Sequence, residues 1–155
     1  MKAIYAGSFD PFTNGHLDIL RDSCDIFEEV HLVIGINAAK KRVYAADDMA
    51  DAIRRMLLRE GISNCVVKVY DGLTAKYCAD HNISYLVRGL RNSMDYSYEE
   101  NIAEVNRLIN PNLNSIYLRT KHVGISSSMV RELFSYGERV DMFVPPEIYA
   151  VMCRN

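Results

Sequence analysis

The stretch from Gly7 to His16, GSFDPFTNGH, joins a short apolar run at Ala3–Ala6 to a helical pattern of apolar residues that begins at Leu17. A strand that ends in such a loop and then opens a helix is the usual first unit of a nucleotide-binding α/β domain. The first N–H groups of the helix have no partners and carry partial positive charge, so they suit a bound phosphate. The stretch therefore predicts a phosphate site that His16 faces from the first helical turn.

The same stretch matches neither of the common phosphate-loop patterns, G-x-G-x-x-G and G-x-x-x-x-G-K-[ST]. It reads T-x-G-H from Thr13 to His16. The plain alternative is a helix-capping loop with an incidental surface histidine, because short motifs often match by chance. The position of the motif, directly between a strand and a helix, favours the phosphate site.

The sequence as a whole indicates one compact domain over residues 1–155, with ordinary apolar and charged fractions. The net charge of −2 lacks the basic excess that is typical of nucleic-acid binders. The cysteines at 24, 65, 78 and 153 form no C-x-x-C pair, and we interpret them as buried thiols of a reducing compartment. No signal peptide or membrane-length apolar run is visible, which predicts a cytoplasmic protein.

Strand and helix patterns alternate along the whole chain. Strands are expected at 2–6, 30–36, 65–70, 84–87 and 114–119, and helices at 15–27, 47–60, 73–81, 96–109, 125–136 and 147–153. In the helix over 96–109, Ile102, Val105 and Leu108 are expected to face the core. This order predicts an α/β fold with one doubly wound, parallel five-stranded sheet.

Polar residues follow each predicted strand, and ligands of such sheets bind beyond the carboxyl ends of the strands. Arginine grips phosphate oxygens in pairs, lysine acts as a point charge, and serines at a helix start offer hydroxyl and N–H groups. The alternatives are solvated surface charge for the basic residues and simple N-capping for the serines. The polar residues are Ser8–His16, Lys40, Thr74, Arg88, Arg91 and Ser126–Ser128.

No nucleophile stands out in these loops. There is no G-x-S-x-G turn and no cysteine beside the motif histidine. Glu99 and Glu100 lie on a predicted helix, where carboxylates are usually solvated. A polyphosphate site without a covalent catalyst suits phosphoryl or nucleotidyl transfer, in which positioning and charge stabilisation do most of the work.

The sequence closely resembles bacterial phosphopantetheine adenylyltransferases of the nucleotidyltransferase superfamily, over nearly the whole chain. The matching segments are Gly7–His16, Lys40, Val87–Arg91, Asp95–Glu99, Asn106–Arg107 and Ile125–Arg131. The resemblance implies a Rossmann-like nucleotidyltransferase fold and transfer of the adenylyl group of ATP to 4′-phosphopantetheine. It also implies Mg²⁺ as cofactor, a homohexamer and feedback inhibition by coenzyme A, with no metal ligand from the chain itself.

The same resemblance implies a role for individual residues. The catalytic residues are expected to be His16, Lys40 and Arg88. The phosphopantetheine ligands are expected to be Ser8, Lys40, Thr74 and Arg88. The ATP ligands are expected to be Ser8, Phe9, His16, Gly89, Leu90, Arg91, Glu99, His122, Val123, Gly124, Ile125, Ser126, Ser127 and Ser128.

The chain departs from the family pattern at three places. Ala6 replaces a frequent proline, Asn37–Ala39 replaces a serine-proline stretch, and His122–Gly124 replaces a segment that often carries an aromatic residue near adenine. Two other functions remain open from the residues: a relative that acts on nicotinamide mononucleotide or a cytidylyl donor, and a non-catalytic nucleotide sensor. His16 discriminates between an enzyme and a sensor, because a protein that only binds nucleotide does not need a hydrogen-bond donor to a transition state.

Overall fold

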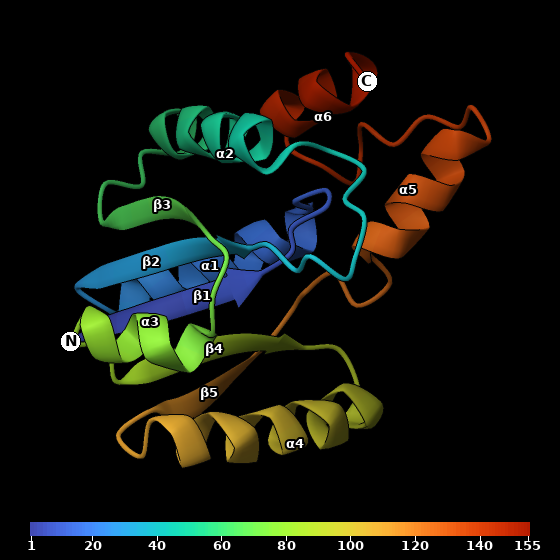
Figure 1. The fold of residues 1–155 in the computed structure, drawn as a ribbon. Helices are drawn as coiled ribbons and strands as arrows, with labels where there is room; N and C mark the ends of the chain where they lie inside the picture. Colours follow the sequence, from blue (N-terminus) through green and yellow to red (C-terminus); the bar gives the residue numbers. More distant parts are fainter.

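The computed structural model describes residues 1–155, and it confirms the predicted alternation of strands and helices (Figure 1). Element ends differ from the predicted ones by a few residues. The strands are β1 (Lys2–Gly7), β2 (Glu29–Gly35), β3 (Cys65–Tyr70), β4 (Tyr85–Leu90) and β5 (Asn114–Arg119). The helices are α1 (Asn14–Ile26), α2 (Ala46–Glu60), α3 (Thr74–Asp80), α4 (Ser93–Ile109), α5 (Ser127–Ser135) and α6 (Pro146–Cys153).

The five strands form one parallel sheet in the order β3-β2-β1-β4-β5. The chain winds from β1 outward to β3, then returns to β4 on the other side of β1 and ends at β5. The strand order therefore reverses between β1 and β4. In open α/β sheets, this reversal leaves a crevice at the carboxyl ends of the two strands, where ligands bind.

Helices cover both faces of the sheet, and β1 divides its side chains between them (Figure 1). Ala3 and Tyr5 belong to a core of 26 buried residues that includes side chains of α1, α2, α5 and α6. Ile4 and Ala6 belong to a smaller core of 9 residues around α3. Burial on both faces explains why β1 and β2 read as nearly continuous apolar runs. None of the helices is long and apolar enough to cross a membrane.

Of the three residues expected to face the core from α4, only Ile102 is half-buried, and the structure contradicts the prediction for the other two. Val105 is 56% exposed and Leu108 is 85% exposed, whereas Glu99 and Ala103 are the buried residues of this helix. Apolar residues lie on more than one side of α4, so periodicity alone could not tell which side packs on the sheet. The outcome is an apolar helix face that is uncovered in the single chain.

Strand β4 is longer than the sequence predicts. It continues through Leu90, so Arg88 and Gly89 lie inside the strand and not in a loop after it. Gly89 allows helix α1 to approach closely, because a Cβ at this position would lie 3.0 Å from Cγ1 of Ile19. A side chain at this position would require Ile19 of α1 to shift by a few tenths of an ångström.

Candidate active site

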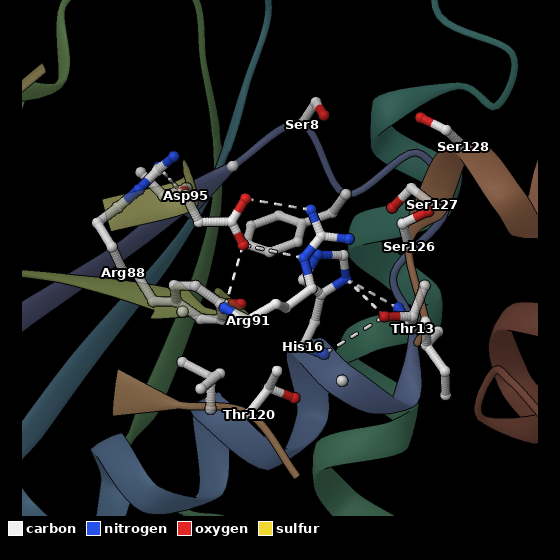
Figure 2. A pocket seen from close by; sticks show the side chains of 18 of the residues that line it. Ser8, Thr13, His16, Arg88, Arg91, Asp95, Thr120, Ser126, Ser127 and Ser128 are labelled. Atoms are coloured by element: carbon white, nitrogen blue, oxygen red, sulfur yellow. Dashed lines mark hydrogen bonds and ion pairs between the residues drawn. The ribbon is translucent and has the colours of Figure 1, made fainter. Parts of the chain in front are cut away.

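A pocket of about 330 Å³ opens at the reversal point of the sheet (Figure 2). The carboxyl ends of β1 and β4 form its floor, and the starts of α1, α4 and α5 form its walls. In Figure 2, Ser126–Ser128 lie on the side opposite Arg88 and Asp95, and the ring of His16 lies between them. The lining residues are Tyr5–Phe9, Thr13, Gly15, His16, Ile19, Arg88, Gly89, Arg91, Asp95, Glu99, Thr120 and Ile125–Ser128.

His16 is fixed by a capping box at the start of α1. The backbone N–H of Thr13 donates to Nδ1 of His16 at 2.9 Å, and the N–H of His16 donates to Oγ1 of Thr13 at 3.4 Å. Since Nδ1 accepts a hydrogen bond, it carries no proton in this arrangement. The proton of the neutral ring then sits on Nε2, which makes no hydrogen bond within the chain and is free to donate to a ligand.

The surroundings of His16 keep its ring neutral. Burial, followed by the positive charges of Arg91 and Arg88, lowers the pKa of His16 to about 4. The rings of Phe9 and Phe12 lie 5.0 and 5.4 Å from the imidazole, measured between ring centroids, and exclude water from one side of it. Near neutral pH the imidazole is therefore a hydrogen-bond donor and not an acid.

Arg88 is held in place by a bidentate ion pair. Its Nε and Nη2 each donate to a carboxylate oxygen of Glu99 at 2.7 Å, and its Nη1 donates to the carbonyl of Ala6 at 2.9 Å. Glu99 is 8% exposed, which corrects the interpretation of this residue as a solvated carboxylate. A guanidinium has five N–H donors, so two donors of Arg88 remain for a ligand in the pocket.

Arg91 pairs with Asp95 at the start of α4. The backbone N–H and Nε of Arg91 both donate to Oδ2 of Asp95 at 3.1 Å, and Asn92 caps the helix through the N–H of Asp95. Burial opposes the charge on Asp95, but the hydrogen bonds from Arg91 outweigh it and lower the pKa of this carboxyl. Asp95 is therefore an anion, and its hydrogen bonds with Arg91 orient that arginine toward the pocket.

Two of the three serines at the start of α5 have different tasks. Ser126 caps the helix by accepting from the N–H of Met129 at 3.1 Å, as the N-capping alternative predicted for at least one of them. Ser127 donates to the carbonyl of Pro11 at 2.8 Å and ties α5 to the motif loop. The pocket is thus bounded by the N-termini of α1 and α5, both of which attract anions.

The structure brings most of the expected site residues to this pocket but leaves several outside its walls. Lys40 is exposed, in a turn that its N–H closes by donating to the carbonyl of Asn37 at 2.9 Å. Thr74 is the first residue of α3, in the connection that follows the edge strand β3. His122 contacts the carboxylate of Asp18 through Nδ1 on the far side of α1. The expected residues outside the walls are Lys40, Thr74, Leu90, His122, Val123 and Gly124.

Sequence reasoning missed several lining residues. Tyr5 is buried inside β1, and Thr120 follows β5, where no motif marks it. Asp95 stands out in the sequence only as part of the segment Asp95–Glu99 that resembles the family. Arg91 lies before the N-cap of α4, so its pairing with Asp95 depends on the turn at the helix start, which no sequence pattern marked.

The cysteines lie away from the pocket, and we expect them to be dispensable for catalysis. Cys78 is fully buried and Cys24 and Cys65 are half-buried, but Cys153 is exposed, contrary to expectation. Replacement of each cysteine by alanine should leave kcat within about twofold of wild type. Cys78→Ala should still lower the free energy of unfolding by about 1 kcal/mol, the usual size for a core substitution. A large fall in kcat, with the fold intact by circular dichroism, would reveal a catalytic thiol.

Comparison with known proteins identifies the family of the chain. The cytidylyltransferase-like family model matches residues 4–133. The phosphopantetheine adenylyltransferase of Cytophaga hutchinsonii is 39% identical over 148 residues, which cover 94% of this chain and 97% of that protein. The phosphopantetheine adenylyltransferase of Shouchella clausii is 38% identical over 152 residues, which cover 95% and 92% of the two chains.

Solved structures with low sequence identity share the fold. A Vibrio parahaemolyticus protein superposes with a TM-score of 0.71 at 16% identity, covering 99% of this chain and 91% of its own. A bifunctional NMN adenylyltransferase/ADP ribose pyrophosphatase from Francisella tularensis superposes with a TM-score of 0.69 at 15% identity, covering 92% and 44%. The full-length relatives and the family model together show that this chain belongs to the phosphopantetheine adenylyltransferase family, within the cytidylyltransferase-like group.

Proposed function

We propose that this chain transfers the adenylyl group of ATP to 4′-phosphopantetheine and releases pyrophosphate, which yields dephospho-coenzyme A. The observation that carries the proposal is the neutral, Nε2-protonated His16 between two helix N-termini and two arginines in one pocket. This arrangement can hold a polyphosphate and stabilise charge on it, and relatives at 38–39% identity carry the name of this activity.

The chemistry requires no covalent intermediate on the protein. The acceptor is a phosphate monoester, whose second pKa is about 6, so near neutral pH it is mostly a dianion. One of its oxygens attacks the α-phosphorus of ATP, and the bond from that phosphorus to the pyrophosphate oxygen breaks. Negative charge grows on the α-phosphate oxygens and on the departing pyrophosphate, where Nε2–H of His16 and the free N–H groups of α1 and α5 meet it.

The remaining donors divide between the two substrates. We assign the acceptor phosphate to the two free donors of Arg88, with Lys40 approaching from the loop after β2. The pantetheine arm then extends along the carboxyl ends of the strands toward Thr74. ATP lies along Gly89–Arg91 and the segment His122–Ser128, with its phosphates at the start of α5. Ser8 and Phe9 lie between the two substrates.

Mg²⁺ is proposed as a companion of ATP and not as a resident of the protein. The chain has no group of three His, Cys, Asp or Glu side chains that could hold a metal ion. The two carboxylates of the pocket, Asp95 and Glu99, are already bonded to arginines. Mg²⁺ prefers phosphate oxygens and water as ligands, so it would enter with the nucleotide and neutralise part of its charge.

The decisive experiment is a pyrophosphate-release assay with Mg²⁺ and ATP against three acceptors. Release with phosphopantetheine, but not with nicotinamide mononucleotide or nicotinate mononucleotide, supports the proposal. Release with CTP in place of ATP would instead indicate a cytidylyltransferase. Nucleotide binding without turnover on any acceptor would favour a sensor and overturn the proposal.

Two further expectations accompany the proposal, one on regulation and one on location. Coenzyme A carries both the phosphopantetheine and the adenosine groups of the product, so it can occupy both halves of the pocket and act as a feedback inhibitor.

We place the protein in the cytoplasm, where ATP is abundant and thiols stay reduced. The four free cysteines suit such a compartment.

We propose that the uncovered face of α4 joins copies of this chain into the homohexamer of the family. Four large apolar side chains lie along this helix with more than half of their surface exposed: Met94 (80%), Tyr98 (65%), Val105 (56%) and Leu108 (85%). A continuous exposed apolar face of this kind usually marks a protein interface, and in a homo-oligomer the partner is a second copy.

Leu108→Glu should dissociate the assembly, because the new carboxylate would be buried without a partner in the interface. Sedimentation velocity at micromolar protein should show a large oligomer for wild type and smaller species for the variant. Leu58→Glu is the matched control, since Leu58 is an equally exposed leucine (82%) on α2. A wild-type monomer, or an unchanged oligomer in Leu108→Glu, would rule out this interface.

A further inference from the structure

Arg42 links two loops that lie far apart in the sequence. It follows Lys40 and Lys41 in a basic run, but its side chain is only 16% exposed, whereas the two lysines are exposed. Its Nη1 donates to the carbonyl of Ser8 at 2.6 Å, and its Nε donates to the carbonyl of Tyr44 at 3.0 Å. One guanidinium thus bridges the pocket-lining loop after β1 and the segment that leads from β2 to α2.

Asp10 completes the link from the other side. Its carboxylate accepts from the N–H groups of Val43 and Tyr44, both at 2.9 Å, and lies 3.9 Å from Nη2 of Arg42. Nη2 is the one buried side-chain nitrogen or oxygen in the chain without a hydrogen-bond partner. Buried polar groups normally have partners. In Arg42 the cost of leaving Nη2 without a partner is offset because Nε and Nη1 of the same guanidinium join the two loops.

The loop that Arg42 holds is strained at one residue. Phe9 has a φ of 44°, in the left-handed region that is costly for a residue with a Cβ. Such a conformation persists where the surroundings over-determine it. The carbonyls on either side of Phe9 are both bonded to arginines, that of Ser8 to Arg42 and that of Asp10 to Arg131.

We propose that Arg42 is a positioning residue that sets the affinity for the acceptor by holding Lys40 and the Ser8–Asp10 loop in one arrangement. This inference rests on the proposed function, in which Ser8 and Lys40 contact phosphopantetheine. Arg42 lies two residues after Lys40 and fixes the base of its loop. The N-termini of α1 and α5, which are assigned to ATP, have capping bonds that do not involve Arg42.

Arg42→Ala should raise the KM for phosphopantetheine about tenfold, the size of one charge-assisted hydrogen bond, and the KM for ATP by less, because ATP shares Ser8 and Phe9 with the acceptor but not Lys40. Asp10 keeps its two backbone donors in this variant, so the protein should fold. Arg42→Lys should restore little, because one ammonium cannot replace two separate nitrogens of a planar fork. Lys41→Ala, an exposed neighbour, is the matched control and should behave as wild type.

A double-mutant cycle with Lys40→Ala separates positioning from a general loss of stability. If Arg42 acts through Lys40, Arg42→Ala in the Lys40→Ala background should change the KM for phosphopantetheine much less than about tenfold. Additive effects, or equal increases in the KM for ATP and for phosphopantetheine, would overturn the proposal.

Hydrogen exchange gives a readout that does not depend on turnover. The amides of Val43 and Tyr44 should exchange faster in Arg42→Ala than in wild type, and unchanged exchange would overturn the link between the two loops. Failure of the proposed function would look different, since wild-type protein would then release no pyrophosphate with phosphopantetheine whatever the state of Arg42.

Discussion

Replacement of His16 by alanine should lower kcat by about 10²–10³, the loss typical of one transition-state hydrogen-bond donor. The KM for ATP should change far less. Charge on the α-phosphate and on pyrophosphate is larger in the transition state than in bound ATP, so a donor aimed at this charge contributes mainly to kcat. Steady-state kinetics with both substrates varied, together with ATP binding by calorimetry, measures the two effects separately.

The structure explains why His16 is a donor and not a base. The backbone N–H of Thr13 donates to Nδ1 of His16, so the proton of the neutral ring is on Nε2. With a pKa lowered to about 4, the neutral ring is the dominant form at every pH above about 5. The pH profile of kcat between about 5 and 9 should therefore contain no step from His16. Any acid limb near pH 6 should come from the acceptor phosphate, which must be a dianion to attack.

Amide substitutions of His16 test this assignment. His16→Asn and His16→Gln can donate a hydrogen bond but cannot act as bases near neutral pH, so they should retain part of the activity that alanine loses. They should also keep the acid limb of wild type, because the phosphate that causes it is unchanged. An acid limb that disappears in these variants would show that His16 titrates in catalysis. A loss of ATP affinity in proportion to kcat would make it a ground-state ligand.

The sequence predicted best those parts of the site that local chemistry dictates. The stretch from Gly7 to His16 joins β1 to α1, as the strand, loop and helix pattern predicted, and Ser126 caps α5. Arg88 lies in strand β4 and Arg91 directly follows it, next to the central strand β1. Each of these features depends on a few neighbouring residues, so a short pattern suffices to identify it.

Features that depend on distant partners could not be predicted in the same way. Glu99 reads as a solvated helical carboxylate until β4 brings Arg88 beside it. The exposed side of α4 is as apolar as a core-facing side, so its pattern cannot reveal what covers it. The burial of Arg42 in a run of basic residues arises because the loop after β1 lies against it. These cases share one cause, since sequence patterns report periodicity and charge but not the element that packs against them.

Arg88→Ala is expected to cause two separable defects. The first is a loss of stability of about 3 kcal/mol, because the carboxylate of Glu99 stays in a mostly buried site without its partner. The second is a rise of roughly 10- to 100-fold in the KM for phosphopantetheine, since charge-assisted hydrogen bonds to the acceptor phosphate are lost. The KM for ATP should rise less, because its assigned contacts lie on other elements.

A second substitution distinguishes the two defects. Glu99→Gln in the Arg88→Ala background removes the unpaired charge, so the midpoint of urea unfolding should return toward wild type, while the KM for phosphopantetheine should stay high. Arg88→Lys should recover only part of the affinity, because one ammonium cannot pair with both Glu99 and the phosphate as the guanidinium can. Equal increases in the KM of both substrates in Arg88→Ala, or recovery of acceptor affinity by Glu99→Gln, would mean that Arg88 shapes the pocket through Glu99 and does not bind the acceptor.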